Sequence, residues 1–275
     1  MKIKTLLLVV FCFYYISYAS CESRIQDICN NSATENNTST ESAKKNLINL
    51  QEVIDIEYGL ITHAKNSIVI DPSEKKEWLI YFYIAADNSL SDCSLRELTK
   101  IRDGSGTKAH IAISYHTKRN GQKISERLVA KDKKLYLEDG DKNGVKDSGS
   151  ALVFKEELEW ALKFNSKKIM LIIWNHGSGI LNKSLPDYQR GICYDNSTGN
   201  FLTDVDLKNM FEITYINSNR KPEILILDAC LMSSIEVAYA LKNSANYLIA
   251  SEDVIPCNSF NYTEQLEIFE NQNPN

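Results

Sequence analysis

The stretch KPEILILDACLM, residues 221–232, begins with a charged, turn-like segment and continues as an unbroken apolar run. Such a run is typical of a strand buried on both faces of a parallel sheet. It ends on an acid, a small residue and a thiol, which are Asp228, Ala229 and Cys230. Open α/β sheets bind ligands at the carboxyl ends of their strands. Cys230 is therefore either a nucleophile or a small core residue.

Other apolar segments of the same kind alternate with segments of helical periodicity. Strands are expected at residues 78–86, 109–116, 168–174, 224–227 and 246–250. Helices are expected at residues 90–101, 148–164, 202–213 and 233–241, and the alternating segment 127–137 indicates a β-hairpin. This order predicts an α/β fold in which a mostly parallel sheet is covered by helices on both faces.

The first twenty residues have the composition of an export signal. Two lysines precede an apolar run at residues 6–16, and small residues suited to a cleavage site follow. We predict a signal peptide at residues 1–20, a polar linker with an N-terminal extension at 21–74, and one folded domain at 75–275. The protein is expected to be secreted or held in the cell envelope, and Cys21 is a candidate lipid anchor.

Composition and charge narrow the class of protein. The net charge is −5 and no basic patch dominates, so no nucleic-acid partner is expected. The four histidines show no ligand spacing, which argues against a metal site. Six of the seven cysteines follow the predicted signal peptide. They allow fifteen disulfide pairings, among which the sequence does not choose.

Three strand ends carry groups that could take part in catalysis. WNHGSG, residues 174–179, places His176 beside Gly177, the next strand leads to Cys230, and the last leads to SED at residues 251–253. Because parallel strands end at the same edge of a sheet, we expect His176 and Cys230 to lie close together. A histidine can lower the pKa of a neighbouring thiol or accept its proton. Backbone N–H groups beside Gly177 could form an oxyanion hole.

Each of these residues also has an ordinary structural interpretation. A lone cysteine at a strand end is more often a small buried hydrophobe, and a lone histidine is more often structural. Asp228 could simply cap the following helix. A carboxylate beside a thiolate would raise the thiol pKa. Asp228 therefore makes more chemical sense in a pocket for a cationic group.

Four motifs together resemble the clostripain-like cysteine peptidases, which are relatives of caspases, gingipains and legumains. The motifs are WNHGSG (174–179), LDACLMSSIEVAYAL (227–241), YFYIAADNSL (81–90) and ANYLIASEDVIP (245–256). The resemblance covers about residues 77–270, in order and with matching spacing. It implies a caspase-like αβα sandwich with a mostly parallel sheet.

The resemblance also implies a role for individual residues. His176 corresponds to the catalytic histidine of the family and Cys230 to its nucleophile. Family members cleave proteins and peptides after Arg or Lys, and Asp228 occupies the position of the acid that holds the basic side chain. Glu252 or Asp253 could contribute to the same acidic pocket.

Two further expectations follow from the resemblance. Several members cleave themselves after a basic residue in the loop that follows the histidine motif, where this chain offers Lys183 and Arg190. Some relatives need calcium, and DGDKNGVKD at residues 139–147 is similar to part of a calcium loop. Ser150 stands where such a loop has its glutamate, so a turn is favoured and calcium is left open.

The sequence departs from the family pattern after the last matched strand. Pro256-Cys257 and Ser259-Phe260 stand where Pro-Gly and Gly-Trp are frequent, and the chain stops at Asn275 where many relatives continue. A C-terminally truncated domain is therefore one expectation. The alternative function is a truncated, non-catalytic surface protein that binds a partner through the same fold.

Overall fold

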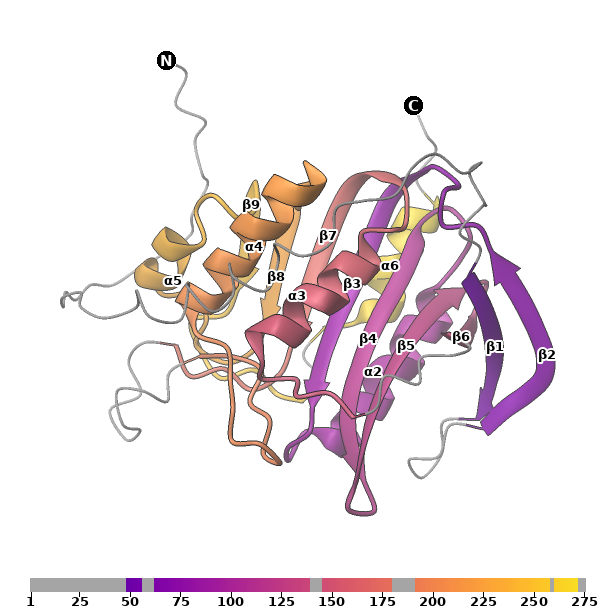
Figure 1. The fold of residues 1–275 in the computed structure, drawn as a ribbon, viewed down its shortest axis with the longest axis horizontal. Coiled ribbons are helices and arrows are strands. Elements are labelled where there is room, and N and C mark those ends of the chain that lie inside the picture. The colour runs from indigo at the N-terminus through magenta and orange to yellow at the C-terminus, as the bar shows by residue number, and fades with distance from the viewer. Residues whose placement is uncertain (1–47, 56–61, 139–144, 180–190, 258–259, 272–275) are drawn as a thin grey trace, which may run out of the picture.

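The computed structural model describes residues 48–55, 62–138, 145–179, 191–257 and 260–271. These residues form a nine-stranded sheet with the order β2-β1-β6-β5-β4-β3-β7-β8-β9, flanked by helices (Figure 1). The strands are β1 (Ile48–Asp55), β2 (Thr62–Ile70), β3 (Lys76–Ala86), β4 (His110–Arg119), β5 (Gln122–Lys131), β6 (Lys134–Glu138), β7 (Ser166–Trp174), β8 (Ile224–Asp228) and β9 (Tyr247–Ala250). The helices are α2 (Ser91–Gly104), α3 (Ala151–Ala161), α4 (Asp204–Ser218), α5 (Ile235–Ala240) and α6 (Tyr262–Asn271).

One half of the sheet is parallel and the other half is antiparallel. Strands β4, β3, β7, β8 and β9 run parallel to one another. Strands β5, β6, β1 and β2 continue the sheet through antiparallel pairs. All five parallel strands were predicted from their apolar runs, and the predicted hairpin is β5–β6. The parallel half is therefore the half that carries the candidate strand ends.

Strands β1 and β2 come from the segment that we expected to be an N-terminal extension. They pair with each other, and β1 also pairs with β6, so this part of the chain widens the antiparallel half of the sheet. Their sequences, INLQEVID and THAKNSIVI, mix polar and apolar residues without a clear period of two. Periodicity alone therefore did not indicate them.

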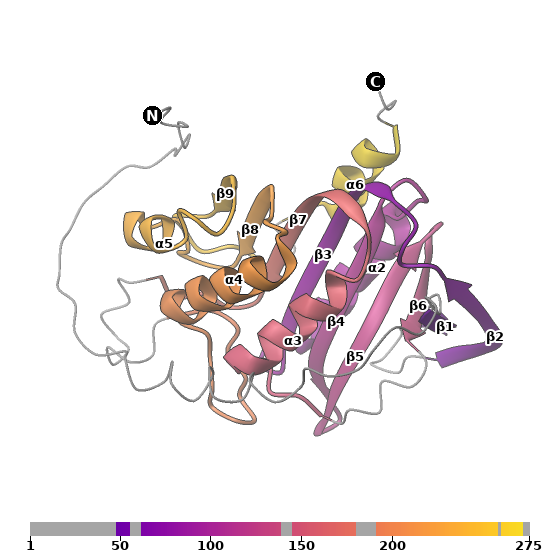
Figure 2. The same cartoon turned by 45° about the horizontal axis from the view of Figure 1, so that its top comes forward.

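Helices cover both faces of the sheet, as predicted. Residues of β3 alternate between two buried clusters because successive side chains of a strand point to opposite faces. Tyr81 and Tyr83 pack in the cluster that includes residues of α3, α4 and α5, whereas Ile80 and Phe82 pack with α2 and α6. Figures 1 and 2 show these two helical layers on opposite sides of the sheet. The αβα sandwich is thus confirmed.

The helix boundaries follow local capping chemistry. Thr203 caps α4, where its side chain accepts a hydrogen bond from the N–H of Asp206 and the Asp206 carboxylate accepts one from the N–H of Thr203. Ser234 caps α5 in a similar way through the N–H of Val237. These caps fix where the chain leaves the loops that follow β7 and β8.

The predicted signal peptide and Cys21 lie outside the described residues. Among the described helices, none is both long and apolar enough to cross a membrane.

Candidate active site

The loops that follow β7 and β8 run side by side at the carboxyl edge of the parallel strands. Trp174 pairs with Asp228 in the sheet, and the N–H of Asn175 donates to the carbonyl of Asp228 at 3.3 Å. His176 and Cys230 therefore leave neighbouring strands at the same edge. The topology places the two loops that carry His176 and Cys230 at one edge of the sheet.

Two glycines allow the histidine loop to approach the thiol loop closely. A Cβ atom added to Gly177 would lie 2.5 Å from the carbonyl oxygen of Cys230. One added to Gly179, whose φ is +52°, would lie 2.3 Å from the carbonyl oxygen of Leu231. Both distances are too short for any side chain, and the backbone of Gly179 is also left-handed. The WNHGSG motif thus needs its glycines to hold His176 against the Cys230 segment.

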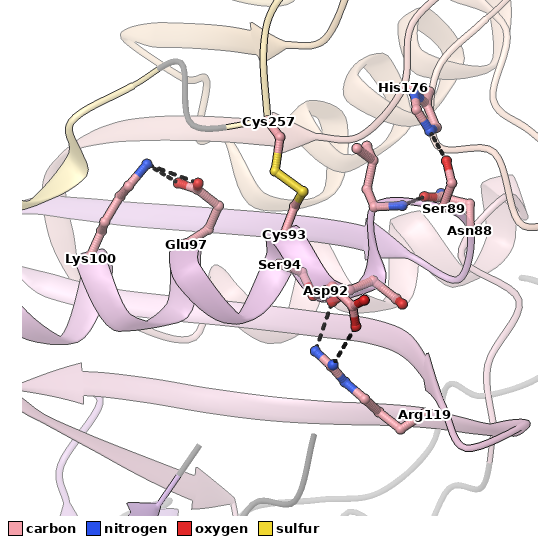
Figure 3. The surroundings of a disulfide bond; sticks show 12 residues. Asn88, Ser89, Asp92, Cys93, Ser94, Glu97, Lys100, Arg119, His176 and Cys257 are labelled. Atoms are coloured by element: carbon pink, nitrogen blue, oxygen red, sulfur yellow. Dashed lines mark hydrogen bonds and ion pairs between the residues drawn. A yellow bond between two sulfur atoms is a disulfide. The ribbon is translucent and has the colours of Figure 1, made fainter. Parts of the chain in front are cut away.

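His176 is half-buried and is held by a serine from a third strand end. The Ser89 hydroxyl lies 2.8 Å from Nε2 of His176, in the turn between β3 and α2 (Figure 3). Burial lowers the pKa of His176 below the usual histidine value. Because Ser89 occupies Nε2, the other ring nitrogen, Nδ1, is the one left to exchange a proton.

The Cys230 thiol is half-buried against the segment that follows β9. The N–H of Ile255 donates to its Sγ atom at 3.3 Å, and the Sγ atom lies 3.7 Å from the carbonyl oxygen of Ile255. Cys230 precedes Leu231, which has a left-handed φ of +63°. A non-glycine residue in this conformation is uncommon and directs the chain sharply away from the strand.

Backbone pairing continues beyond the ends of β8 and β9. The N–H of Leu231 donates to the carbonyl of Asp253 at 3.2 Å, and the N–H of Ser233 donates to the carbonyl of Ser251 at 2.9 Å. Residues 251–255 therefore form one wall beside the thiol. On this wall Glu252 and Asp253 are exposed.

Asp228 has a different environment from the other two candidate acids. Only 3% of its surface is exposed, and its carboxylate accepts a hydrogen bond from the Tyr262 hydroxyl of α6. It belongs to the α2–α6 face of the sheet, because strand alternation places it on the same side as Ile226. Burial and the Asp228 charge raise the pKa of Tyr262 well above its usual value.

A second buried acid, Glu97 of α2, lies in the same interior. Burial raises the pKa of Glu97, the Lys100 ammonium opposes this rise, and the Asp228 charge adds to it. Lys100 lies 2.9 Å from the Glu97 carboxylate and also donates to the carbonyl of Phe260 at 3.0 Å (Figure 3). Sequence reasoning missed Glu97. Its position next to Leu98, on the apolar stripe of a predicted helix, could have indicated that Glu97 is buried.

A cavity of about 460 Å³ adjoins His176 on the side of β3. It is bounded by the turn after β3, the histidine loop and the segment before α4. The lining residues are Asn88, Ser89, His176, Gly177, Ser178, Tyr194, Asp195, Asn196, Gly199, Asn200 and Phe201. Cys230 is not among them.

The described residues near this cavity do not fit a calcium ion. The Lys123 ammonium lies 3.0 Å from carboxylate oxygens of both Asp87 and Asp195, and so takes the place that a cation would need. The part of the chain that the structure describes holds no group of three or more His, Cys, Asp or Glu side chains arranged for a metal. Residues 139–144 of the possible calcium loop lie outside the described residues. Asp147, at the end of that segment, accepts hydrogen bonds from Gly149, Thr198 and Asn200.

Two other expectations cannot be placed, and two features were not foreseen. Lys183 and Arg190 lie outside the described residues. The Ser89–His176 contact was missed because the two residues lie 87 positions apart in the sequence. A disulfide between Cys93 and Cys257 was also not predicted. Both cysteines follow strand ends at the same edge, which is the signal that could have paired them.

Comparison with known proteins identifies the family of the chain. The sequence model of the clostripain family matches residues 82–274, more than half of the chain. The chain belongs to the clostripain family. Clostripain from Hathewaya histolytica is 26% identical over 254 residues, which cover 82% of this chain and 46% of that protein.

Two solved structures share the fold. A secreted C11 cysteine protease from Bacteroides thetaiotaomicron, in complex with an irreversible peptide inhibitor, matches with a TM-score of 0.53 and 22% identity. An inactive zymogen of a C11 protease from Parabacteroides distasonis matches with a TM-score of 0.53 and 24% identity. Each match covers 68% of this chain and 52% of the other. The chain thus spans about half the length of the relatives that it matches.

Proposed function

We propose that this chain forms the catalytic domain of an exported cysteine endopeptidase that cleaves after Arg or Lys. The observation that carries the proposal is the close approach of two loops, in which Gly177 packs on the carbonyl of Cys230. This contact holds the residue next to His176 against the thiol segment. Family membership supports the same assignment.

In the proposed reaction, Cys230 acts as the nucleophile and His176 transfers the proton. The sulfur forms a bond to the scissile carbonyl carbon, and the carbonyl electron pair moves to the oxygen. Backbone N–H groups of Gly177 and Cys230 stabilise this oxyanion. The C–N bond then breaks as His176 protonates the leaving amine. Water, deprotonated by His176, hydrolyses the resulting thioester.

Ser89 selects the ring nitrogen that acts. With the Nε2–H donating to the Ser89 hydroxyl, Nδ1 carries a lone pair that can accept the thiol proton. Burial lowers the pKa of His176, so the neutral ring that this step requires persists to lower pH than in a free histidine. The same shift makes the protonated ring a stronger acid toward the leaving amine.

The proposed specificity rests on Asp228, with Glu252 or Asp253 at the exposed wall. A substrate guanidinium would replace the Tyr262 hydroxyl as the hydrogen-bond donor to the Asp228 carboxylate. A bidentate contact would favour Arg over Lys. Self-cleavage at Lys183 or Arg190 is part of the proposal. The related C11 protease from Parabacteroides distasonis has a zymogen form, which supports this part of the proposal.

One observation favours the second candidate, a non-catalytic protein that binds a partner. Asp228 is 3% exposed, with Tyr262 bonded to its carboxylate. If a basic substrate side chain does not displace the Tyr262 hydroxyl, the Asp228 carboxylate serves only as an internal hydrogen-bond acceptor. The two candidates therefore differ in what Asp228 does.

Peptide assays with matched variants separate the two candidates. The assay uses peptides in which Arg, Lys or Ala precedes a reporter group. It compares wild type with Cys230→Ala and Asp228→Asn. The control is Cys193→Ala, which removes the other free thiol among the described residues. We expect cleavage after Arg and Lys by wild type and control, none by Cys230→Ala, and a lower Arg-to-Ala ratio for Asp228→Asn. Circular dichroism checks that each variant folds. Activity retained by Cys230→Ala rejects the nucleophile, and an unchanged ratio rejects the pocket.

A further inference from the structure

A disulfide joins the two chain segments that flank the candidate dyad. Cys93 lies in the first turn of α2 and Cys257 in the segment after β9, 164 residues later, with Cα atoms 5.9 Å apart. Figure 3 shows the bond near the turn that carries Ser89, whose side chain contacts His176. One end of the bridge is thus close in sequence to the residue that contacts His176. The other end is close in sequence to Ile255, which contacts Cys230.

The α2 end of the bridge is firmly anchored. Arg119 of β4 lies 3.2 Å from the Asp92 carboxylate and donates to the carbonyl of Ser91 at 2.7 Å (Figure 3). The Ser94 hydroxyl lies 2.9 Å from the Tyr115 hydroxyl, also on β4. The first turn of α2 is therefore fastened to the sheet on both sides of Cys93.

The other end of the bridge holds a segment without regular secondary structure. Residues 251–257 follow the short strand β9, and four of them are exposed in the structure: Glu252, Asp253, Val254 and Pro256. The segment contacts the thiol loop through the backbone bonds of Leu231 and Ser233 and through the N–H of Ile255. Hydrogen bonds of a short segment without regular secondary structure open more easily than those of core strands. A covalent link to an anchored helix would keep them closed.

We propose that Cys93 and Cys257 are positioning residues, whose disulfide holds residues 251–257 on Cys230. The bond keeps the N–H of Ile255 directed at the sulfur and keeps the wall beside the scissile bond in place. The effect on peptide cleavage rests on the proposed function, whereas the effect on the reactivity of the Cys230 thiol does not.

The proposal requires reduced sulfur at Cys230 and oxidised sulfur at Cys93 and Cys257. Cys230 acts only as a thiol or thiolate, whereas Cys93 and Cys257 position the loop only as a disulfide. A dithiol such as dithiothreitol breaks the S–S bond by supplying two electrons and two protons. Two thiols form, and the reagent becomes a cyclic disulfide. Activity should therefore be highest in mild reductant and fall again in strong reductant.

The experiment compares wild type with Cys93→Ser/Cys257→Ser over a dithiothreitol series. Iodoacetamide alkylation of Cys230 is followed from pH 5 to 9 by peptide mass mapping, and kcat and KM are measured on an Arg peptide. We expect the alkylation curve of the double variant and of fully reduced wild type to differ from that of oxidised wild type, because Ile255 no longer stays in contact with the sulfur. We also expect a kcat lowered several-fold. Reoxidation should restore wild type only.

Each outcome decides the question. If the double variant loses thermal stability but keeps both the alkylation curve and kcat, the bond is only a structural staple and the proposal is rejected. If the variant does not fold, reduced and reoxidised wild type provide the same comparison. A displaced alkylation curve in a protein that cleaves no peptide would uphold the positioning role and reject the peptidase assignment. Unchanged curves in reduced wild type would reject the positioning role alone.

Discussion

Two clusters of buried or half-buried ionisable groups in this molecule differ in how their side chains are paired. On the α3 side of the sheet, the Glu157 carboxylate is 1% exposed and is surrounded by fixed donors. Arg127 lies 2.9 Å from it, Lys146 2.5 Å and the Ser114 hydroxyl 2.7 Å. At the strand ends, the half-buried His176 ring contacts the neutral Ser89 hydroxyl. The first cluster is closed, whereas the second keeps a group able to exchange a proton.

The two environments move pKa values for different reasons. Burial alone would raise the pKa of Glu157, but hydrogen bonds from Arg127 and Lys146 outweigh it and lower the pKa to about 2. For His176, burial is the cause that lowers the pKa. A charge that cannot be lost near neutral pH suits a structural site. A ring that changes protonation in that range suits catalysis.

The largest expected effect is on activity, at the histidine. His176→Ala should lower kcat/KM for an Arg peptide by roughly 10³-fold, because proton transfer to the leaving amine is lost. The melting temperature should hardly change, since a half-buried ring that is hydrogen-bonded to an exposed hydroxyl contributes little to stability. Steady-state kinetics and a thermal melt make the test.

A large loss of stability in His176→Ala together with normal kinetics would contradict the catalytic role of His176 and make it a structural residue like Glu157. His176→Gln serves as a control, because it keeps a hydrogen-bonding side chain near Ser89 but cannot act as an acid or base.

The next effect is on stability, at the buried acid. Glu157→Ala should lower the free energy of unfolding by about 3–5 kcal/mol, because Arg127 and Lys146 would keep buried charges without their partner. Glu156 is a matched control on the same helix, since it contacts the same two cations but its side chain is 52% exposed. Glu156→Ala should cost about 0–1 kcal/mol. Urea unfolding at pH 7 measures both.

Acid titration sharpens the same prediction. The pKa of Glu157 in the folded protein is about 2, below its ordinary value of 4.5, so its contribution to stability is complete above the ordinary value. That contribution is lost as the pH falls toward 2. The stability difference between wild type and Glu157→Ala should therefore shrink over this interval. A difference that stayed constant would mean that Glu157 is not held ionised by its partners.

Sequence reasoning reached the fold and placed His176 and Cys230 at strand ends of the same edge, because both depend on local patterns. Unbroken apolar runs predicted the parallel strands, and the small and reactive residues at their ends pointed to His176 and Cys230. Strands β1 and β2 lack such runs and are held by pairing with distant segments. No periodicity predicts that pairing.

What the sequence could not supply is contact between segments far apart in the chain. The Cys93–Cys257 bond was one of fifteen possible pairings in the sequence. Asp228 was assigned to a pocket by its position in a motif, but its burial under Tyr262 depends on where α6 packs. Glu97 and Glu157 are acids on helices, and only their tertiary partners distinguish them from surface carboxylates.

The smallest expected effect concerns Ser89, where the open cluster is held by a single exposed hydroxyl. Solvent competes for such a bond, so Ser89→Ala should lower kcat by about two- to tenfold, the range that one net hydrogen bond supports. KM and the melting temperature of Ser89→Ala should be unchanged. Ser89→Thr keeps the hydroxyl and should restore most of the rate. Ser91→Ala, at the start of α2, should behave as wild type. Because burial sets the pKa of His176, the acid limb of kcat/KM should stay below the usual histidine pKa in all of these variants. A limb that moved only in Ser89→Ala would show that the hydroxyl, rather than burial, sets the protonation of the ring.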